Sequence, residues 1–180
     1  MNQTGDRLIK IRKWLKENNF DAIIIPHDDE YLSEYIPPEN ERLAWLTGFT
    51  GSAGIAIISN ESAAIFVDGR YTVQVKQQVD GNHFTILHLA ENPFMKWLSN
   101  NHMPIKRLGF DSRLHRVNWV KSATKALGNN MELIAIPENP IDLFWKDRPL
   151  GVSDQALLLN MQFTGKSSKE KRTEMGKIIA

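Results

Sequence analysis

Residues 54–68 have the sequence GIAIISNESAAIFVD, and this stretch is the most informative one about the fold. It contains two runs rich in apolar residues, 54–59 and 62–68, which only Asn60 and Glu61 separate. So short a connection joins antiparallel neighbours, because a parallel crossover needs a dozen or more residues. The stretch therefore predicts a β-hairpin.

A helix and a buried strand are expected upstream of this hairpin. Leu8, Ile11 and Leu15 recur at i, i+3 and i+7 among charged residues, which indicates an apolar stripe on a helix that Thr4 caps. Residues 21–26, DAIIIP, are a short β-branched run closed by proline, which is typical of a strand buried on both faces. A helix followed by a buried strand indicates α/β architecture, and the hairpin makes the sheet mixed.

The same alternation of helix and strand continues along the chain. We expect helices over 39–46, 71–79, 93–98, 115–127 and 140–145, and strands over 84–89, 107–110 and 131–136. Gly48 lies where a helix C-terminus favours a residue free to adopt positive φ. The alternation fills residues 1–150, about one domain. The predicted fold class is α/β, a mixed β-sheet flanked by helices.

Residues 151–180 have a different pattern. The apolar runs 157–159 and 161–163 indicate a new strand, and Ser167 or Ser168 can cap a charged helix that follows. The sequence shows no apolar surface in residues 1–150 against which the apolar positions of this helix would obviously pack. We interpret the segment as a linker and the start of a second, truncated domain, and the alternative is a natural C-terminal helix that folds back.

Composition excludes several classes of protein. The 180 residues include no cysteine, so a disulfide framework, a thiolate zinc site and a catalytic thiol are excluded, and a reducing cytoplasm is the expected location. A net charge of +1 argues against a nucleic-acid partner. The apolar runs are far shorter than the roughly 20 residues needed to span a bilayer, so no membrane partner is expected.

A glycine-rich stretch, GFTGSAG at 48–54, could suggest a phosphate cradle. Phosphate loops run from strand to glycines to helix, however, and here a predicted helix precedes the glycines and a strand follows them. The order favours tight packing and a turn instead. Ser52 lacks the first glycine of a nucleophile elbow, because Thr50 stands at that position, and it also lacks the strand-to-helix context.

The remaining polar groups do not form a complete active site. The five histidines show no His-Glu-x-x-His pattern. The sequence HDDE at 27–30 follows a strand and is interpreted as a solvated loop rather than a metal site. The basic residues of the last segment are interpreted as one solvated helix face: Lys166, Lys169, Lys171 and Arg172. No catalytic and no metal-binding residue is therefore assigned to this chain.

Several motifs occur in an order that resembles a known family. They are SEYI at 33–36, Arg42, GFTGSAG at 48–54, DGRY at 68–71, DRP at 147–149 and FTGKSS at 163–168. In this combination the chain resembles the N-terminal, creatinase-type domain of the long, three-domain Xaa-Pro aminopeptidases (aminopeptidase P). These are metallopeptidases with a pita-bread catalytic domain.

The resemblance implies the function of a longer protein. It implies a cytoplasmic hydrolase, a protease that removes the N-terminal residue from short peptides whose second residue is proline. It also implies two divalent metal ions, usually manganese, in a C-terminal domain that is absent from these 180 residues. This chain alone is then expected to be inactive and to serve substrate access and the assembly of a homodimer.

Arg70 and Tyr71 are the candidate site residues under this resemblance. They follow the predicted turn at Asp68, and an exposed cation there suits the C-terminal carboxylate of a peptide. The alternative is that Asp68 and Arg70 tie the turn together while Tyr71 packs into the next helix. One departure concerns Tyr31, where members of the family commonly have a histidine, although the acidic position at Asp29 is retained.

Two other functions remain open from the sequence. A stand-alone version of this domain could only bind a peptide or protein, and a groove lined by Trp45, Phe49 and Tyr71 would suit that role. The same fold could also belong to a related creatinase-type hydrolase of C–N bonds. The motifs at 68–71 and 147–149, with the start of a second domain, favour the aminopeptidase.

Overall fold

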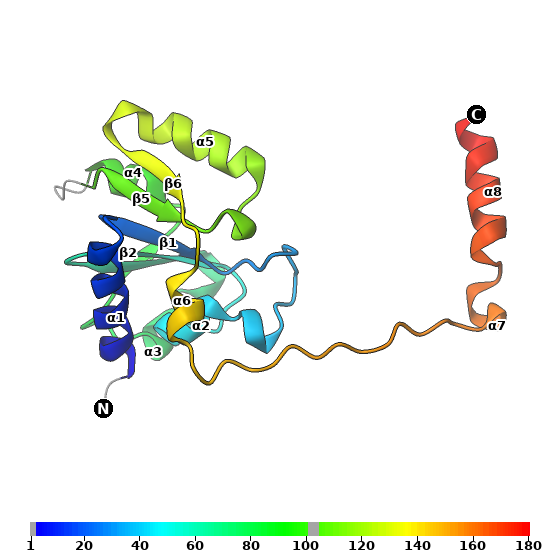
Figure 1. The fold of residues 1–180 in the computed structure, drawn as a ribbon, viewed down its shortest axis with the longest axis horizontal. Coiled ribbons are helices and arrows are strands. Elements are labelled where there is room, and N and C mark those ends of the chain that lie inside the picture. The colour runs from blue at the N-terminus through cyan, green and yellow to red at the C-terminus, as the bar shows by residue number, and fades with distance from the viewer. Residues whose placement is uncertain (1–2, 101–104) are drawn as a thin grey trace.

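The computed structural model describes residues 3–100 and 105–180, and a six-stranded sheet forms the centre of the fold (Figure 1). The strand order is β4-β3-β2-β1-β5-β6. The strands are β1 (Ala22–Pro26), β2 (Gly54–Ser59), β3 (Ala63–Val67), β4 (Thr85–His88), β5 (Arg107–Phe110) and β6 (Glu132–Ala135). All six strands expected between residues 21 and 136 are present, with bounds that differ by at most one residue at either end.

The sheet is mixed, as the hairpin predicted. β2 pairs antiparallel with both β1 and β3, whereas β5 is parallel to β1 and to β6, and β4 is parallel to β3. Ile57 of β2 is paired with Ala64 of β3 on one side and with Ile24 of β1 on the other. Every residue of β1 is buried, which confirms the prediction of a strand covered on both faces.

Helices cover both faces of the sheet. They are α1 (Gln3–Glu17), α2 (Arg42–Thr47), α3 (Gln74–Gln78), α4 (Phe94–Asn100), α5 (Val117–Leu127), α6 (Pro140–Phe144), α7 (Met161–Thr164) and α8 (Ser168–Ile179). Short 3-10 helices occur at Pro38–Asn40, Gly69–Tyr71, Ser112–Leu114 and Gly128–Asn130. None of the helices within the described residues has both the length and the apolar character needed to cross a membrane.

Two hydrophobic clusters follow from the alternation of side chains along the strands. Ile23 and Ile25 of β1 belong to the cluster that includes α1, α2, α3 and α6. Ile24, which points to the opposite face, belongs to the cluster that includes α4 and α5. The sheet is therefore the middle layer of three.

Some predicted boundaries differ from the observed ones. Thr4 lies inside α1 and does not cap it, because the helix already includes Gln3. The helix expected over 39–46 is a 3-10 turn followed by α2, and Gly48 ends α2 with φ of 83°, as predicted. The helix expected from residue 71 begins at Gln74.

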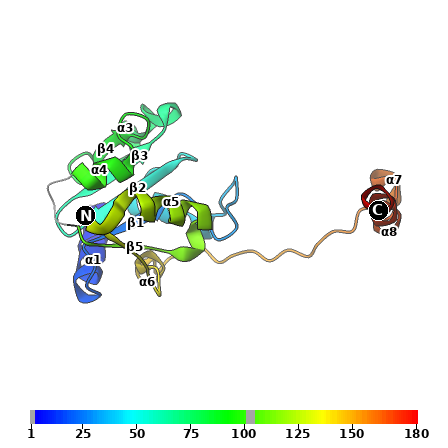
Figure 2. The ribbon, with the colours of Figure 1, turned by 90° about the horizontal axis from the view of Figure 1, so that it is seen from above.

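The segment 151–180, which we call the tail, does not contain the predicted strand. Residues 157–159 are extended without pairing to any described strand, and 161–163 belong to α7. Strand formation depends on a neighbouring strand, and the tail lies apart from the sheet in both views (Figures 1 and 2). The predicted helix does form as α8, and Ser167 and Glu170 make a reciprocal capping box at its start.

Candidate functional site

The turn after β3 holds the first candidate residue, Arg70. The Asp68 carboxylate caps the 3-10 turn by accepting a hydrogen bond of 2.9 Å from the Arg70 backbone N–H. The Arg70 guanidinium also donates to Asp68, with 2.6 Å from Nη2 to Oδ2 and 3.0 Å from Nε to Oδ2. These hydrogen bonds hold the pKa of Asp68 below its ordinary value and raise that of Arg70. The ion pair between Asp68 and Arg70 therefore holds this turn together, which was the alternative to a substrate contact in the interpretation of the sequence.

Arg70 is nevertheless available to solvent. Its side chain is 67% exposed, and its guanidinium carbon lies 5.1 Å from the centre of the Tyr71 ring. Asp68 therefore fixes the orientation of the guanidinium without covering it. An oriented, exposed guanidinium at the end of a buried strand is a chemically suitable contact for a carboxylate.

Tyr71, the second candidate, joins the turn to the glycine-rich loop. Its ring meets Phe49 edge-on, with 5.6 Å between ring centres and an interplanar angle of 81°. Its hydroxyl lies 2.6 Å from Ser52 Oγ, and this hydrogen bond lowers the pKa of Tyr71. Tyr71 therefore packs back against the loop that precedes β2.

The glycines at 48–54 are explained by this packing. A Cβ on Gly51 would lie 2.3 Å from Phe49 Cζ and 2.8 Å from Tyr71 Cδ1, closer than carbon atoms approach. Together with the positive φ of Gly48, this supports the prediction of tight packing over a phosphate cradle. Ser52 is used to hold Tyr71.

The three aromatic residues expected to line a peptide groove together do not form one, because Phe49 has no exposed surface. Phe49 is fully buried and belongs to the core. Trp45 stacks on Trp145 at 5.9 Å, and the Arg7 guanidinium lies 4.5 Å from the centre of the Trp45 ring. The groove of Trp45, Phe49 and Tyr71 was therefore a wrong prediction, because a side chain with no exposed surface cannot line a groove.

Acidic side chains of the loop 27–30 make hydrogen bonds within the fold. Asp29 is fully buried and accepts hydrogen bonds from the backbone N–H groups of Tyr31 and Ser33, at 3.0 and 2.9 Å. Burial acts to raise the pKa of Asp29, but the hydrogen bonds from Ser33 and Tyr31 outweigh burial and hold it below its ordinary value. Asp29 thus shapes the loop. The part of the chain that the structure describes contains no group of three or more His, Cys, Asp or Glu side chains that could hold a metal ion.

A network of charged side chains that the sequence did not predict lies at the carboxyl ends of β1, β5 and β6. At its centre is Arg42, which is 1% exposed and donates from Nε to Asp142 Oδ1 at 2.8 Å and from Nη2 to Glu30 Oε1 at 2.7 Å. Asp142 also pairs with Arg148 at 3.0 Å and with Arg113 at 3.5 Å. Arg42 is thus a buried cation compensated by two carboxylates.

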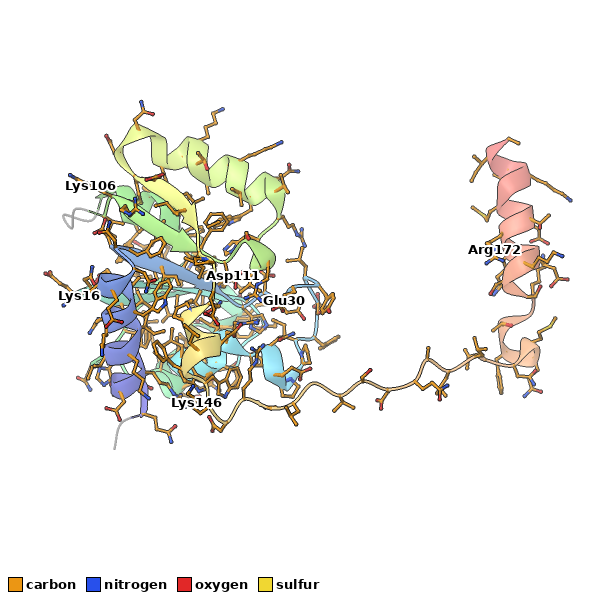
Figure 3. The ribbon with its side chains drawn as sticks, viewed as in Figure 1. Lys16, Glu30, Lys106, Asp111, Lys146 and Arg172 are labelled. Carbon is orange, nitrogen blue, oxygen red and sulfur yellow. The ribbon has the colours of Figure 1, made fainter. Side chains whose placement is uncertain are left out.

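Arg113 extends the network to Asp111. Its guanidinium lies 2.7 Å from Asp111 Oδ2 and 3.8 Å from Glu30 Oε1, so Glu30 and Asp111 lie near each other, as Figure 3 shows. The sequence shows a charged residue, Arg42, among the apolar residues of α2, which could have indicated a buried ion pair. Its partners could not be found in this way, because Glu30 is 12 residues away and Asp142 is 100 residues away. Arg148 donates to the backbone oxygen of Glu39, which ties the segment just before the tail to the loop that precedes α2.

Comparison with known proteins places the chain in a family. The family model for the Creatinase/Prolidase N-terminal domain matches residues 7–142. The chain belongs to this family. Its similarity to individual relatives extends further along the sequence than the domain itself.

Two curated relatives show how far the similarity extends. A probable Xaa-Pro aminopeptidase P from Coccidioides posadasii is 35% identical over 178 residues, which are 97% of this chain and 27% of the relative. Xaa-Pro aminopeptidase 2 from Homo sapiens is 36% identical over 166 residues, 91% of this chain and 25% of the relative. The chain thus spans about a quarter of the length of these relatives.

Solved structures share the fold. The X-prolyl aminopeptidase from Caenorhabditis elegans, described as a cytosolic enzyme with a di-nuclear active site, superposes with a TM-score of 0.86 at 24% identity. That match covers 98% of this chain and 31% of the other. The X-Pro aminopeptidase from Thermotoga maritima gives a TM-score of 0.58 at 24% identity and covers 72% of this chain and 33% of the other. The creatinase-type fold expected from the motifs is therefore confirmed.

Proposed function

We propose that this chain is the N-terminal, non-catalytic domain of a long-form Xaa-Pro aminopeptidase. Such an enzyme removes the first residue from peptides whose second residue is proline. The observation that carries the proposal is the extent of the similarity. Identity with a probable Xaa-Pro aminopeptidase P covers 97% of the chain, well past residue 142, where the domain family ends. This extent favours the aminopeptidase over a stand-alone binding module or another creatinase-type hydrolase.

The metals of this enzyme would be held outside these 180 residues. The described residues do not fit a metal centre, since none of their groups of three or more His, Cys, Asp or Glu side chains could hold a metal ion. The description of the Caenorhabditis elegans enzyme as di-nuclear is consistent with two divalent ions in the longer protein. Manganese, a cytoplasmic location and a homodimer are part of the proposal.

An activity assay tests this proposal. The purified 180-residue chain is expected to release no amino acid from an Xaa-Pro peptide with added manganese, whereas the full-length gene product releases it. The intact mass of the natural gene product is expected to be several times 20.6 kDa, since relatives are about four times longer than this chain. Manganese-dependent release by the 180 residues alone, or a natural product near 20.6 kDa, would contradict the proposal.

Within this function, Arg70 and Tyr71 are proposed to face the entrance used by substrate or a partner subunit. The support is the exposed guanidinium that Asp68 orients over the Tyr71 ring. Such a group can pair with the C-terminal carboxylate of a short peptide. The domain would in this way favour short peptides over long ones.

Substitution of Arg70 tests this role. In the full-length enzyme, Arg70→Ala is expected to reduce the preference for short peptides by raising KM for the shortest substrate more than for longer ones. Lys76→Ala is the matched control, because Lys76 is an exposed cation on the neighbouring helix α3. An unchanged length preference in Arg70→Ala would leave Arg70 as a residue that only stabilises the turn.

A further inference from the structure

A pocket of about 230 Å³ lies at the ends of the parallel strands β1 and β5. Pro26, the last residue of β1, forms part of its wall, and Leu114 and Trp119 come from the segment that follows β5. The carboxyl ends of parallel strands are the usual place for ligands in open α/β sheets. The volume is below the roughly 300–1,000 Å³ of pockets for drug-sized molecules, so it suits a ligand of the size of one amino acid.

The apolar part of the pocket centres on Trp119. Its ring lies 4.1 Å from the His115 ring and 6.3 Å from the Phe110 ring, measured between ring centres. The other apolar lining residues are Pro26, Leu32, Ile55 and Leu114. This wall can contact an apolar side chain, and the ring contacts fix Trp119 in place.

His115 presents a hydrogen-bond acceptor at the pocket. Its Nδ1 lies 2.8 Å from the backbone oxygen of Asp111, and since a carbonyl can only accept, Nδ1 carries the proton. Burial lowers the pKa of His115, which favours the neutral ring with a lone pair on Nε2. Nε2 is buried and has no hydrogen-bond partner among the residues described. A ligand that donates a hydrogen bond would satisfy this acceptor.

One acid and one base complete the lining. Asp28 and Arg116 are both exposed, and within the described part of the chain neither forms an ion pair. Asp28 is close enough to His115 for its charge to act on the pKa of the imidazole. Arg116 is the N-cap residue of α5, and its side chain makes no capping hydrogen bond, so the first turn of this helix also favours a negative group.

We propose that this pocket binds a free α-amino acid with an apolar side chain. The ammonium group lies between the Asp28 carboxylate and His115 Nε2, since it offers three donors. The carboxylate lies at Arg116, and the side chain contacts Trp119. The inference rests on the pocket and not on the proposed peptidase function, and binding can be measured without any catalytic activity.

Titration of the 180-residue protein with L-leucine, followed by NMR, tests the proposal. Saturable shifts are expected for the indole N–H of Trp119 at L-leucine concentrations up to about 10 mM. The analogue 4-methylpentanoate lacks the ammonium group and isopentylamine lacks the carboxylate, so each is expected to bind at least about tenfold more weakly. No saturable shift, or equal binding of all three compounds, would overturn the proposal.

Variants assign the contacts. Asp28→Asn and Arg116→Gln are each expected to lower the affinity for L-leucine at least about tenfold. Both side chains are exposed, so the fold is retained. Glu34→Gln is the matched control, because Glu34 is an exposed acid of the same loop that does not line the pocket. Affinity that is unchanged in Asp28→Asn and Arg116→Gln would contradict the assigned orientation and with it a zwitterion site.

Discussion

The sheet-bearing part of the molecule and the tail contain similar apolar residues in opposite environments. Ile24 in β1 has no exposed surface, whereas Leu158 in the tail is 99% exposed. Leu157, Phe163 and Ile179 are also more than 70% exposed. Apolar sequence alone therefore does not bury a segment, because burial needs a facing surface, and the tail has none within the described residues. Matched substitutions in the two parts are therefore expected to have unequal effects.

The largest difference is expected between two ion pairs. Arg42→Ala leaves Glu30 and Asp142 without their buried partner and is expected to lower the free energy of unfolding by about 4 kcal/mol. Lys166→Ala removes the ion pair with Glu174 in the tail, where the side chains of Lys166 and Glu174 are 55% and 51% exposed. This substitution is expected to change the free energy of unfolding by less than about 1 kcal/mol. Urea unfolding followed by circular dichroism measures the free energy of unfolding of both variants. Similar losses in the two variants would contradict the expected difference.

A smaller difference is expected between two apolar truncations. Ile24→Ala opens a cavity between β1 and the layer of α4 and α5, at a cost of about 3 kcal/mol. Leu158→Ala is expected to stay within about 0.5 kcal/mol of the unsubstituted chain, because Leu158 is already in water. Thermal and urea unfolding measure both values. A comparable cost for Leu158→Ala would mean that the tail packs on the sheet in solution.

The smallest effect concerns Asp111 and depends on pH. Burial acts to raise the pKa of Asp111, but hydrogen bonds from Arg113 and Asn139 hold it below its ordinary value. Because the folded pKa is depressed, this stabilisation is complete above the unfolded value of about 3.9 and is lost as pH falls through the folded value.

Asp111→Asn is therefore expected to cost about 2 kcal/mol at pH 7 and to flatten the loss of stability in acid. Asp154→Asn, at an exposed position in the tail, is the control and is expected to leave the acid profile unchanged. Unfolding midpoints measured between pH 7 and pH 2 give the two profiles. An acid profile in Asp111→Asn as steep as that of the unsubstituted chain would show that Asp111 does not carry this stabilisation.

The fold was predictable wherever local sequence and long-range structure agree. The hairpin at 54–68 has its turn residues and its apolar runs within fifteen positions, so its pairing did not depend on distant segments. The alternative interpretation of Asp68 and Arg70 was equally local, because the two residues are neighbours in one turn. The capping box at Ser167 is another local feature that the structure confirms.

Features that depend on distant partners were missed. Arg42 meets Asp142 across 100 positions, and nothing in the sequence pairs the two. The segment 157–163 has the composition of a strand but no strand beside it, so part of it forms α7 instead. Likewise, Phe49 could not be assigned to the core from its flanking residues, since its neighbours include Tyr71 from the far side of the hairpin.

Hydrogen exchange measured by mass spectrometry tests the central comparison most directly. In the 180-residue chain, amides of β1, β2 and β3 are expected to exchange slowly. Those of α8 are expected to exchange nearly as fast as in an unstructured peptide, because every residue of α8 is exposed. In the full-length gene product α8 is expected to become protected, because the proposed function requires further polypeptide that can cover its apolar side chains. Protection of α8 equal to that of β1 in the 180-residue chain, or no gain of protection in the longer protein, would contradict the account.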